Sequence, residues 1–210
     1  MQTEQDVQEI RVGIFSGVFD PVHKGHISFA LTALREAKLD SVYFLVEAKP
    51  HRKTGVSHVA HRIAMAKLAT APYPKLRVLE LPDKQFTVAK TLPRLNKIFS
   101  GSQLHFLCGS DMLRHMPDWL HVDRLLKQAG LVVGVREPDD QKIAQKLISR
   151  LPCSPVTITV INSPEPGVSS GQIREAIKNH KTAKGLLPST QKYAGKHWLY
   201  ELPSGSSSAS

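Results

Sequence analysis

Hydrophobic and polar positions along the chain follow two alternating patterns. Helical spacing is clearest beyond residue 26, where one face of a helix carries Ile27, Ala30, Leu31 and Leu34. Comparable spacing predicts further helices over residues 58–70, 87–100 with a disturbance at Pro93, 111–128 and 139–150. Short apolar runs between these segments predict buried strands over residues 10–15, 41–47, 75–81, 103–109, 130–136 and 156–162.

Strands that alternate with helices predict βαβ units and therefore an α/β fold. We expect a Rossmann-like, doubly wound, mainly parallel sheet with helices on both faces. In such sheets ligands bind beyond the carboxyl ends of the strands, where the strand order reverses, so the strand-to-helix junctions are the places to search for chemistry. We expect one domain over residues 1–203 and a disordered tail, SGSSSAS, over residues 204–210.

The composition limits the class of protein. A chain of 210 residues, 41% of them hydrophobic, is long enough for one domain with a substantial core. Cys108 and Cys153 form neither a metal-ligand pattern nor a disulfide framework, which favours a reducing compartment. No apolar stretch reaches the length of a membrane span, and the N-terminal residues lack the features of a secretory signal. We therefore expect a cytoplasmic protein without a membrane partner.

The charge balance indicates the kind of partner. The chain has 28 Lys and Arg residues against 18 Asp and Glu residues, a net charge of +10. This excess favours nucleotides, nucleic acid or an acidic surface as partners, although a basic, well-solvated surface explains it equally well. No block of five Lys and Arg residues occurs and aromatic residues make up only 6% of the chain, so a long nucleic-acid-binding track is not indicated. The sequence leaves the oligomeric state open.

The first strand-to-helix junction, GIFSGVFDPVHKGH (13–26), has unusual chemistry. Gly17 lets the backbone approach a ligand, and Asp20 can accept hydrogen bonds from free amides of the turn. His23 and His26 stand at the start of a helix, whose unpaired N–H groups and dipole attract anions. Two imidazoles there suit a phosphate that gains charge during a reaction. Zinc binding would need a third ligand, and simple capping of the turn is the structural alternative.

The segment GVFDPVHKGH (17–26) resembles the G-x-F-D-P-x-H-x-G-H signature of the nucleotidyltransferase superfamily, whose H-x-G-H element binds the phosphates of ATP. Ser16 and Val18 depart from the usual pattern, because the family often has Gly and Thr at these positions. The resemblance implies that five residues of the segment belong to an ATP site: Gly17, Phe19, Asp20, His23 and His26.

The second junction, NSPEPGVSSGQIREAI (162–177), begins another helix. Ser169 and Ser170 are natural N-caps, and Arg174 lies one turn into the helix, where it can reach an anion at the helix start. An ordinary capped helix with a surface arginine is the alternative. The segment resembles the I-S-S-T-x-I-R motif of the same superfamily, which holds the ATP triphosphate, except that Gly171 replaces the threonine. The resemblance implies ATP binding by Ser169, Ser170 and Arg174.

The third junction, LVEAKPHRKTGVSHVAHRIAMAKLA (45–69), contains a basic loop. The basic residues of this loop are Lys49, His51, Arg52 and Lys53. Such a run is typical of a solvated loop, and equally of a mobile loop that grips a phosphorylated substrate. The segment resembles the P-H-K loop and H-R-x-x-M helix of the pyridine-nucleotide adenylyltransferases, which implies that these four residues bind the acceptor. His61 and Arg62 either orient the loop or pack the helix.

The fourth junction, FLCGSDMLRHMPDW (106–119), resembles the G-A-D-x-L…W segment of the same enzymes. The resemblance implies that Gly109 and Asp111 belong to the ATP site, with Asp111 accepting hydrogen bonds from ribose hydroxyls. It also implies that Trp119 offers its indole face to the pyridine ring, for which core packing is the alternative.

Two further segments resemble the nicotinate or nicotinamide mononucleotide adenylyltransferases. DKQFTVAKTL (83–92) is similar to an aromatic-Thr stretch that lines the pyridine pocket, which implies acceptor contacts from Phe86 and Thr87. GLLPSTQKYAGKHWLY (185–200) is similar to the family's L-L-P-x-x-V-x-x-Y-I-x(4)-L-Y ending, apart from two positions.

The resemblance implies an enzyme of NAD biosynthesis that transfers the adenylyl group of ATP to nicotinate or nicotinamide mononucleotide and releases pyrophosphate. The implied catalytic residues are His23, His26 and Arg174. The implied cofactor is Mg²⁺, which enters with ATP and is held mostly by phosphates and water, without a protein metal site. ATP and a pyridine mononucleotide are the expected partners, and nucleic acid is not favoured. Two alternatives stay open: a different phosphorylated acceptor, or a nucleotide-binding protein that has lost turnover.

Overall fold

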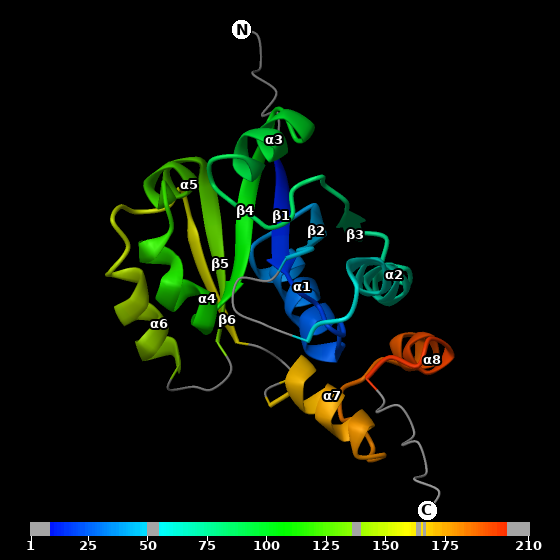
Figure 1. Ribbon diagram of the computed structural model, residues 1–210. Coiled ribbons are helices and arrows are strands. Elements are labelled where there is room, and N and C mark those ends of the chain that lie inside the picture. Colours follow the sequence, from blue (N-terminus) through cyan, green and yellow to red (C-terminus); the bar gives the residue numbers. More distant parts are fainter. Residues whose placement is uncertain (1–8, 50–54, 136–139, 163–164, 166, 201–210) are drawn as a thin grey trace, which may run out of the picture.

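The centre of the molecule is a six-stranded sheet with the strand order β3-β2-β1-β4-β5-β6, in which all neighbouring strands are parallel (Figure 1). The strands are β1 (Ile10–Gly17), β2 (Ser41–Val46), β3 (Leu76–Leu79), β4 (Ser102–Gly109), β5 (Ala129–Val135) and β6 (Ile158–Asn162). The computed structural model describes residues 9–49, 55–135, 140–162, 165 and 167–200. The strand order confirms the predicted Rossmann-like, doubly wound sheet.

The helices lie on both faces of the sheet, as expected (Figure 1). They are α1 (Lys24–Glu36), α2 (Val59–Thr70), α3 (Thr91–Ile98), α4 (Ser110–His115), the 3₁₀ turn η1 (Met116–Asp118), α5 (Val122–Gln128), α6 (Asp140–Ile148), α7 (Ser170–Lys178) and α8 (Pro188–Lys196). The single helix predicted over residues 111–128 is wrong. Pro117 lies in the 3₁₀ turn, and His121 has a left-handed φ of 63°, so the chain changes direction before α5.

Other predicted bounds change by a few residues. The strand predicted over 75–81 spans only Leu76–Leu79, and the strand predicted over 156–162 begins at Ile158. The helix predicted over 87–100 spans Thr91–Ile98, because residues 87–90 form a turn that leads into it. The expectation of one domain over residues 1–203 stays a prediction, and the expected tail, residues 204–210, lies outside the described residues.

The sheet separates two clusters of buried side chains. Along β4, Phe106 and Cys108 face the cluster beneath α3–α6, whereas Leu107 faces the cluster beneath α1 and α2. Strand β5 alternates in the same way, with Val132 on the side of α1 and α2 and Val133 on the other. Because both faces are covered, the ends of the strands are fixed in place, and so are the helix starts that follow them.

The strand order places β1 and β4 side by side at the centre of the sheet, where the direction of winding reverses. The last two helices of the chain lie near the first part of the sheet. Helix α7 starts beside the turn that follows β1, and α8 packs against α2 (Figure 1). The helices in the described part of the chain include none long and apolar enough to cross a membrane.

Candidate active site

The turn after β1 brings the two signature histidines together. His23 is the N-cap residue of α1, and its backbone N–H donates to Nδ1 of His26 over 3.2 Å. The two imidazole rings stack with centroids 3.6 Å apart, and His23 is buried. The edge of Phe19 contacts His26, with ring centroids 5.0 Å apart. Both imidazoles are thus held in defined positions at the start of α1, as the sequence predicted for an anion site.

Gly17 and Phe19 shape this turn from inside the protein. Phe19 is buried and has a left-handed φ of 50°. A Cβ on Gly17 would lie 3.1 Å from the Phe19 ring, closer than nine in ten real Cβ contacts. Gly17 was expected to let the backbone approach a ligand. The structure shows a second reason for a glycine at this position, because the absence of a side chain leaves room for the Phe19 ring.

Asp20 is buried and acts as the anchor of the turn. Its Oδ1 accepts a hydrogen bond from the Tyr200 hydroxyl over 2.7 Å, and its Oδ2 accepts from the Ser57 amide over 3.1 Å. Asp20 was expected to bond amides of its own turn. It instead joins the turn to the segment before α2 and to residue 200. Burial, the largest cause, raises the pKa of Tyr200, so the phenol stays a donor to the carboxylate.

The start of α7 is bonded to the same turn. Ser169 is its N-cap, accepting from the Gln172 amide over 3.3 Å, and Ser170 Oγ donates to the Pro21 carbonyl over 2.9 Å. Arg174 Nη1 donates to the Asp20 carbonyl over 2.7 Å. The structure therefore brings together the two motifs that the sequence places about 150 residues apart.

Gly171, which replaces the family's threonine, is exposed at the start of α7. A Cβ added there would lie 3.9 Å from Ser169 Oγ, an ordinary contact distance. The position therefore has space for a side chain, and what it lacks relative to the family is a hydroxyl.

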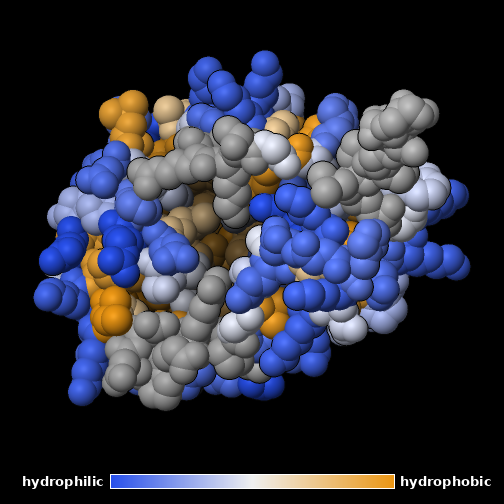
Figure 2. Space-filling model, turned by 60° about the horizontal axis from the view of Figure 1, so that its bottom comes forward, coloured by the Kyte–Doolittle hydropathy of each residue, from blue (hydrophilic) through white to orange (hydrophobic). Residues whose placement is uncertain are grey.

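A cavity of about 1170 Å³ opens on the other side of the turn, lined by Gly17 and Val18. Three aromatic rings form one wall: Phe86 lies 4.6 Å from Phe106 and 6.0 Å from Trp119, centroid to centroid. Figure 2 shows a hollow in this end of the molecule, with hydrophobic residues inside it and hydrophilic residues around it. Trp119 is half-buried. It packs against the core and also forms part of the cavity wall.

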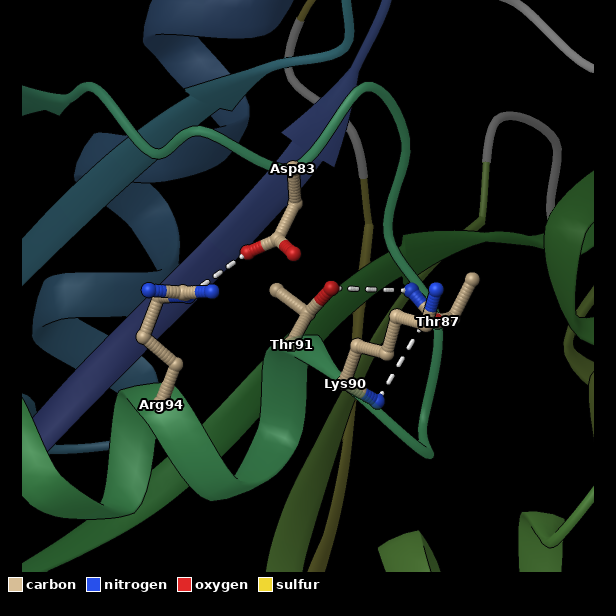
Figure 3. Close-up of polar contacts among 5 residues, drawn as sticks. All are labelled: Asp83, Thr87, Lys90, Thr91 and Arg94. Carbon is tan, nitrogen blue, oxygen red and sulfur yellow. Dashed lines mark hydrogen bonds and ion pairs between the residues drawn. The ribbon is translucent and has the colours of Figure 1, made fainter.

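The loop between β3 and α3 forms a second wall of the cavity. The backbone N–H of Thr87 donates to Thr91 Oγ1 over 3.0 Å, and the N–H of Lys90 donates to Thr87 Oγ1 over 3.3 Å (Figure 3). Asp83 pairs with Arg94 over 2.9 Å, also drawn in Figure 3. These bonds fix Thr87 in place at the cavity, and its expected role in acceptor binding stays a prediction.

Lys49 is exposed at the cavity, and its backbone N–H donates to the Lys84 carbonyl over 2.7 Å. The basic loop thus meets the β3–α3 loop. The other predicted loop residues, His51, Arg52 and Lys53, lie outside the described residues. His61 faces α8, with Nδ1 3.1 Å from the Tyr193 hydroxyl, so helix packing accounts for it.

Asp111 is exposed, lines the cavity and lies in the first turn of α4. Gly109 is the N-cap residue of α4 in extended conformation. It is exposed but is not among the cavity-lining residues. The structure therefore places Asp111 at the cavity with Gly109 near it at the start of α4, and their expected roles in ATP binding stay predictions.

Sequence reasoning missed several residues around the site. Glu47 lines the cavity at the end of β2, is buried, and accepts from Ser16 Oγ over 2.9 Å. This bond explains why Ser16 departs from the family's glycine. Lys84 and Lys90 are cavity-lining cations on either side of the predicted Phe86–Thr87 pair. Because these two lysines flank the Phe86–Thr87 pair in the sequence, they could have been identified as candidate site residues.

The chain matches the model of the family described as cytidylyltransferase-like over residues 14–176. It is 32% identical to the "Probable nicotinate-nucleotide adenylyltransferase" of Carboxydothermus hydrogenoformans over 186 residues, which cover 85% of this chain and 91% of that protein. It is also 32% identical to the nicotinate-nucleotide adenylyltransferase of Bacillus subtilis over 200 residues, covering 91% of this chain and 98% of that one.

Among solved structures, the fold is similar to Plasmodium falciparum nicotinic acid mononucleotide adenylyltransferase in complex with NaAD. The TM-score is 0.74 at 18% identity, covering 91% of this chain and 98% of the other. A second structure of that protein, in complex with APC, gives a TM-score of 0.73 at 16% identity with the same coverage.

Proposed function

Because the chain belongs to the cytidylyltransferase-like family, we propose that it transfers the adenylyl group of ATP to nicotinate mononucleotide, a step of NAD biosynthesis. Relatives about 30% identical over most of the chain carry this activity in their names. The products are the dinucleotide and pyrophosphate. The choice of the acid form of the mononucleotide follows the relatives, which are nicotinate enzymes.

One observation of the structure supports this proposal most. Arg174 of α7 donates to the carbonyl of Asp20, three residues before the His23 that caps α1, so two helix starts and the Arg174 guanidinium surround one turn. Helix starts bind anions through unpaired N–H groups and the helix dipole. We propose that the triphosphate of ATP lies here, with catalytic roles for His23, His26 and Arg174.

The other residues of the proposed ATP site fall into two groups, those that are buried and those that face the cavity. Asp20 and Phe19 are buried, and they act by holding the turn in shape rather than by touching phosphate. Asp111 faces the open cavity, where its carboxylate accepts hydrogen bonds from ribose hydroxyls. The proposed ATP-binding residues are Gly17, Phe19, Asp20, His23, His26, Gly109, Asp111, Ser169, Ser170 and Arg174.

The acceptor occupies the aromatic cavity. Trp119 and Phe86 offer faces and edges to a flat pyridine ring, and such contacts contribute beyond buried area. Lys49 at the mouth of the cavity attracts an anionic mononucleotide. The proposed acceptor-binding residues are Lys49, His51, Arg52, Lys53, Phe86, Thr87 and Trp119, of which residues 51–53 lie outside the described residues.

The reaction needs no side-chain nucleophile. An oxygen of the acceptor's 5′-phosphate forms a bond to the α-phosphorus of ATP, the bond from that phosphorus to the β-phosphate oxygen breaks, and pyrophosphate leaves. Both reactants are anions, so the protein's task is to offset their repulsion and align them. His23, His26 and Arg174 stabilise charge as it moves toward the leaving pyrophosphate.

Adenylyl transfer from ATP uses a divalent cation, and we propose Mg²⁺. The described residues contain no group of three His, Cys, Asp or Glu side chains that could hold a metal ion. Mg²⁺ prefers oxygen ligands, and we propose that phosphate and water oxygens hold it. When bound, the cation would neutralise charge on the phosphates. The expectation of a cytoplasmic location stays a prediction.

The test is pyrophosphate release from ATP with three acceptors: nicotinate mononucleotide, nicotinamide mononucleotide and a phosphorylated acceptor without a pyridine ring. We expect release with nicotinate mononucleotide, together with formation of the dinucleotide. Release with the third acceptor alone would favour a different nucleotidyltransferase. Binding of ATP without release for any acceptor would indicate a nucleotide-binding protein that has lost turnover.

A further inference from the structure

Arg62 in α2 is a buried cation between the two halves of the proposed site: the turn after β1, where we propose that ATP binds, and the aromatic cavity, where we propose that the acceptor binds. Its side chain is 1% exposed. Its guanidinium donates four hydrogen bonds, all to backbone carbonyls. The accepting carbonyls and distances are Ser57 at 2.8 Å, Val18 at 2.8 Å, Glu47 at 2.7 Å and Ala48 at 3.0 Å.

These carbonyls belong to three segments that are far apart in the sequence. Val18 lies in the turn after β1 that leads to the signature histidines. Glu47 and Ala48 follow β2 and directly precede Lys49, at the entrance of the basic loop. Ser57 lies just before α2, and its amide is bonded to Asp20 in the β1 turn. One guanidinium thus contacts the ATP side, the acceptor side and the segment that joins them.

The geometry requires an arginine. A guanidinium has five N–H donors fixed in one plane, whereas a lysine has three donors on a single nitrogen and cannot reach four carbonyls of separate segments. Burying the cation is costly, and burial lowers the pKa of Arg62, with the nearby Asp20, Tyr200 and Glu47 acting in the opposite direction. The four carbonyl contacts occupy Nε, Nη1 and Nη2, so each nitrogen of the guanidinium bonds the backbone.

We propose that Arg62 is a positioning residue that sets the distance between the turn after β1, where ATP is proposed to bind, and the segment from Glu47 to Lys49, which lines the proposed acceptor cavity. This inference rests on the proposed function. In-line transfer requires the 5′-phosphate and the α-phosphorus to be aligned, and a misplacement of about 1 Å costs about 100-fold in rate. Arg62 touches neither substrate, so each substrate binds its own half without it, and only their mutual alignment depends on it.

The experiment compares Arg62→Lys with Ala69→Gly in a pyrophosphate-release assay. Ala69 is buried in the same helix, seven residues beyond Arg62, and has no side-chain polar group, so its replacement tests the effect of weakening α2. We expect Arg62→Lys to lower kcat about 100-fold while KM for ATP and for nicotinate mononucleotide each change less than about threefold. Ala69→Gly should lower the Tm and leave both kcat and KM within about twofold of the wild type.

The outcomes separate the two proposals. Absence of activity in the wild type contradicts the proposed function. An active wild type together with equal kcat values for Arg62→Lys and Ala69→Gly overturns the positioning role. A rise in KM for one substrate with unchanged kcat also overturns it, because Arg62 would then support only one half of the site.

Hydrogen exchange of the wild-type protein keeps the proposal testable if Arg62→Lys does not fold. The amides of Glu47 and Ser57 are bonded to Gly17 and Asp20, respectively. If Arg62 holds these segments as a unit, both amides exchange through one opening event, with protection factors that agree within about threefold as denaturant is added. Independent opening of the two amides would refute the positioning role.

Discussion

The two halves of the site are built in opposite ways. On the proposed ATP side, the turn after β1 is bonded to distant segments of the chain: Asp20 accepts from Tyr200, Ser57 and Arg174. On the acceptor side, a cavity of about 1170 Å³ opens beside a wall of aromatic rings. The first region holds donors in fixed positions, and the second offers space and apolar surface.

This difference matches two kinds of chemistry. Stabilising the charge on a phosphate depends on donors that are already in place, because each reorganisation would cost energy during the reaction. Recognising a flat ring depends on contact area and the geometry of aromatic faces. Substitutions in the first region should therefore change the rate, and substitutions in the second should change the binding of one substrate.

Removing an imidazole from the ATP side should have the largest effect. We expect His26→Ala to lower kcat/KM by about 100- to 1000-fold, the size seen when one active-site donor to developing charge is lost. The fold should persist, because the bond lost within the protein, from the His23 amide to Nδ1, contributes only about 1 kcal/mol. The measurement is pyrophosphate release alongside a thermal melt.

A matched control is His180→Asn, which removes an exposed imidazole beyond the end of α7. His180 has a φ of 52°, which asparagine tolerates. This variant should keep full activity. A His26→Ala protein with wild-type turnover would break the assignment of the ATP side.

The second-largest kinetic effect is expected from truncating an aromatic side chain of the cavity wall. We expect Trp119→Ala to raise KM for nicotinate mononucleotide about 10- to 100-fold, since stacking of a base on an aromatic side chain is worth about 1–3 kcal/mol. KM for ATP should stay within about twofold. Trp198→Ala is the control, because Trp198 is 78% exposed and outside the cavity. Equal changes in both KM values would contradict a division of the site into two halves.

A smaller effect is expected from the loop drawn in Figure 3. Thr91→Val removes the acceptor of the Thr87 amide and leaves that N–H without its partner, a loss of about 1 kcal/mol. KM for the mononucleotide should rise about fivefold. Thr70→Val makes the same change at a buried position of α2, where the hydroxyl only bonds its own helix. If the two variants behave alike, the Thr87–Thr91 bond has no part in acceptor binding.

The smallest effect on catalysis is expected inside the sheet, in the central strand β4. His105 is buried in β4 and accepts a hydrogen bond from Arg11 Nε over 3.2 Å. Burial first, and then the Arg11 charge, lower the pKa of His105 to about 4. Between pH 6.5 and 4 the unfolded chain therefore binds a proton that the folded one does not, so stability should fall as the pH falls, by at most about 3 kcal/mol.

His105→Gln keeps an acceptor for Arg11 and removes the titration. The free energy of unfolding of this variant is measured by denaturant titration at several pH values. It should not show the decrease that His105 causes as the pH falls from 6.5 to 4. Its activity at pH 7 should stay that of the wild type. An unchanged pH profile of stability in His105→Gln would show that this residue does not titrate differently in the folded state.

Much of the fold and of the ATP side could be predicted from the sequence. The apolar runs and helical spacing are local patterns, and the two signature motifs are short and contiguous, so their chemistry is visible without a structure. The helix predicted over residues 111–128 failed because Pro117 in a 3₁₀ turn and a positive φ at His121 interrupt an otherwise helical pattern.

The acceptor side was harder to predict because its wall is assembled from separate segments. Lys84 and Lys90 look like surface lysines until the loop folds over the cavity. Arg62 could be either a packing residue or a loop anchor, and only the positions of four carbonyls decide between them. Contacts of this kind depend on long-range geometry, for which a single sequence has no local signal.

The bond between Tyr200 and Asp20 also has a consequence for the order of events during synthesis. The two residues are 180 positions apart, so a ribosome makes the whole sheet before the phenol that Asp20 accepts from exists. Contacts of such high sequence separation form late, because a long loop must close first. A nascent chain can therefore complete the walls of the aromatic cavity while the turn after β1 still lacks its bond to the C-terminal part of the chain.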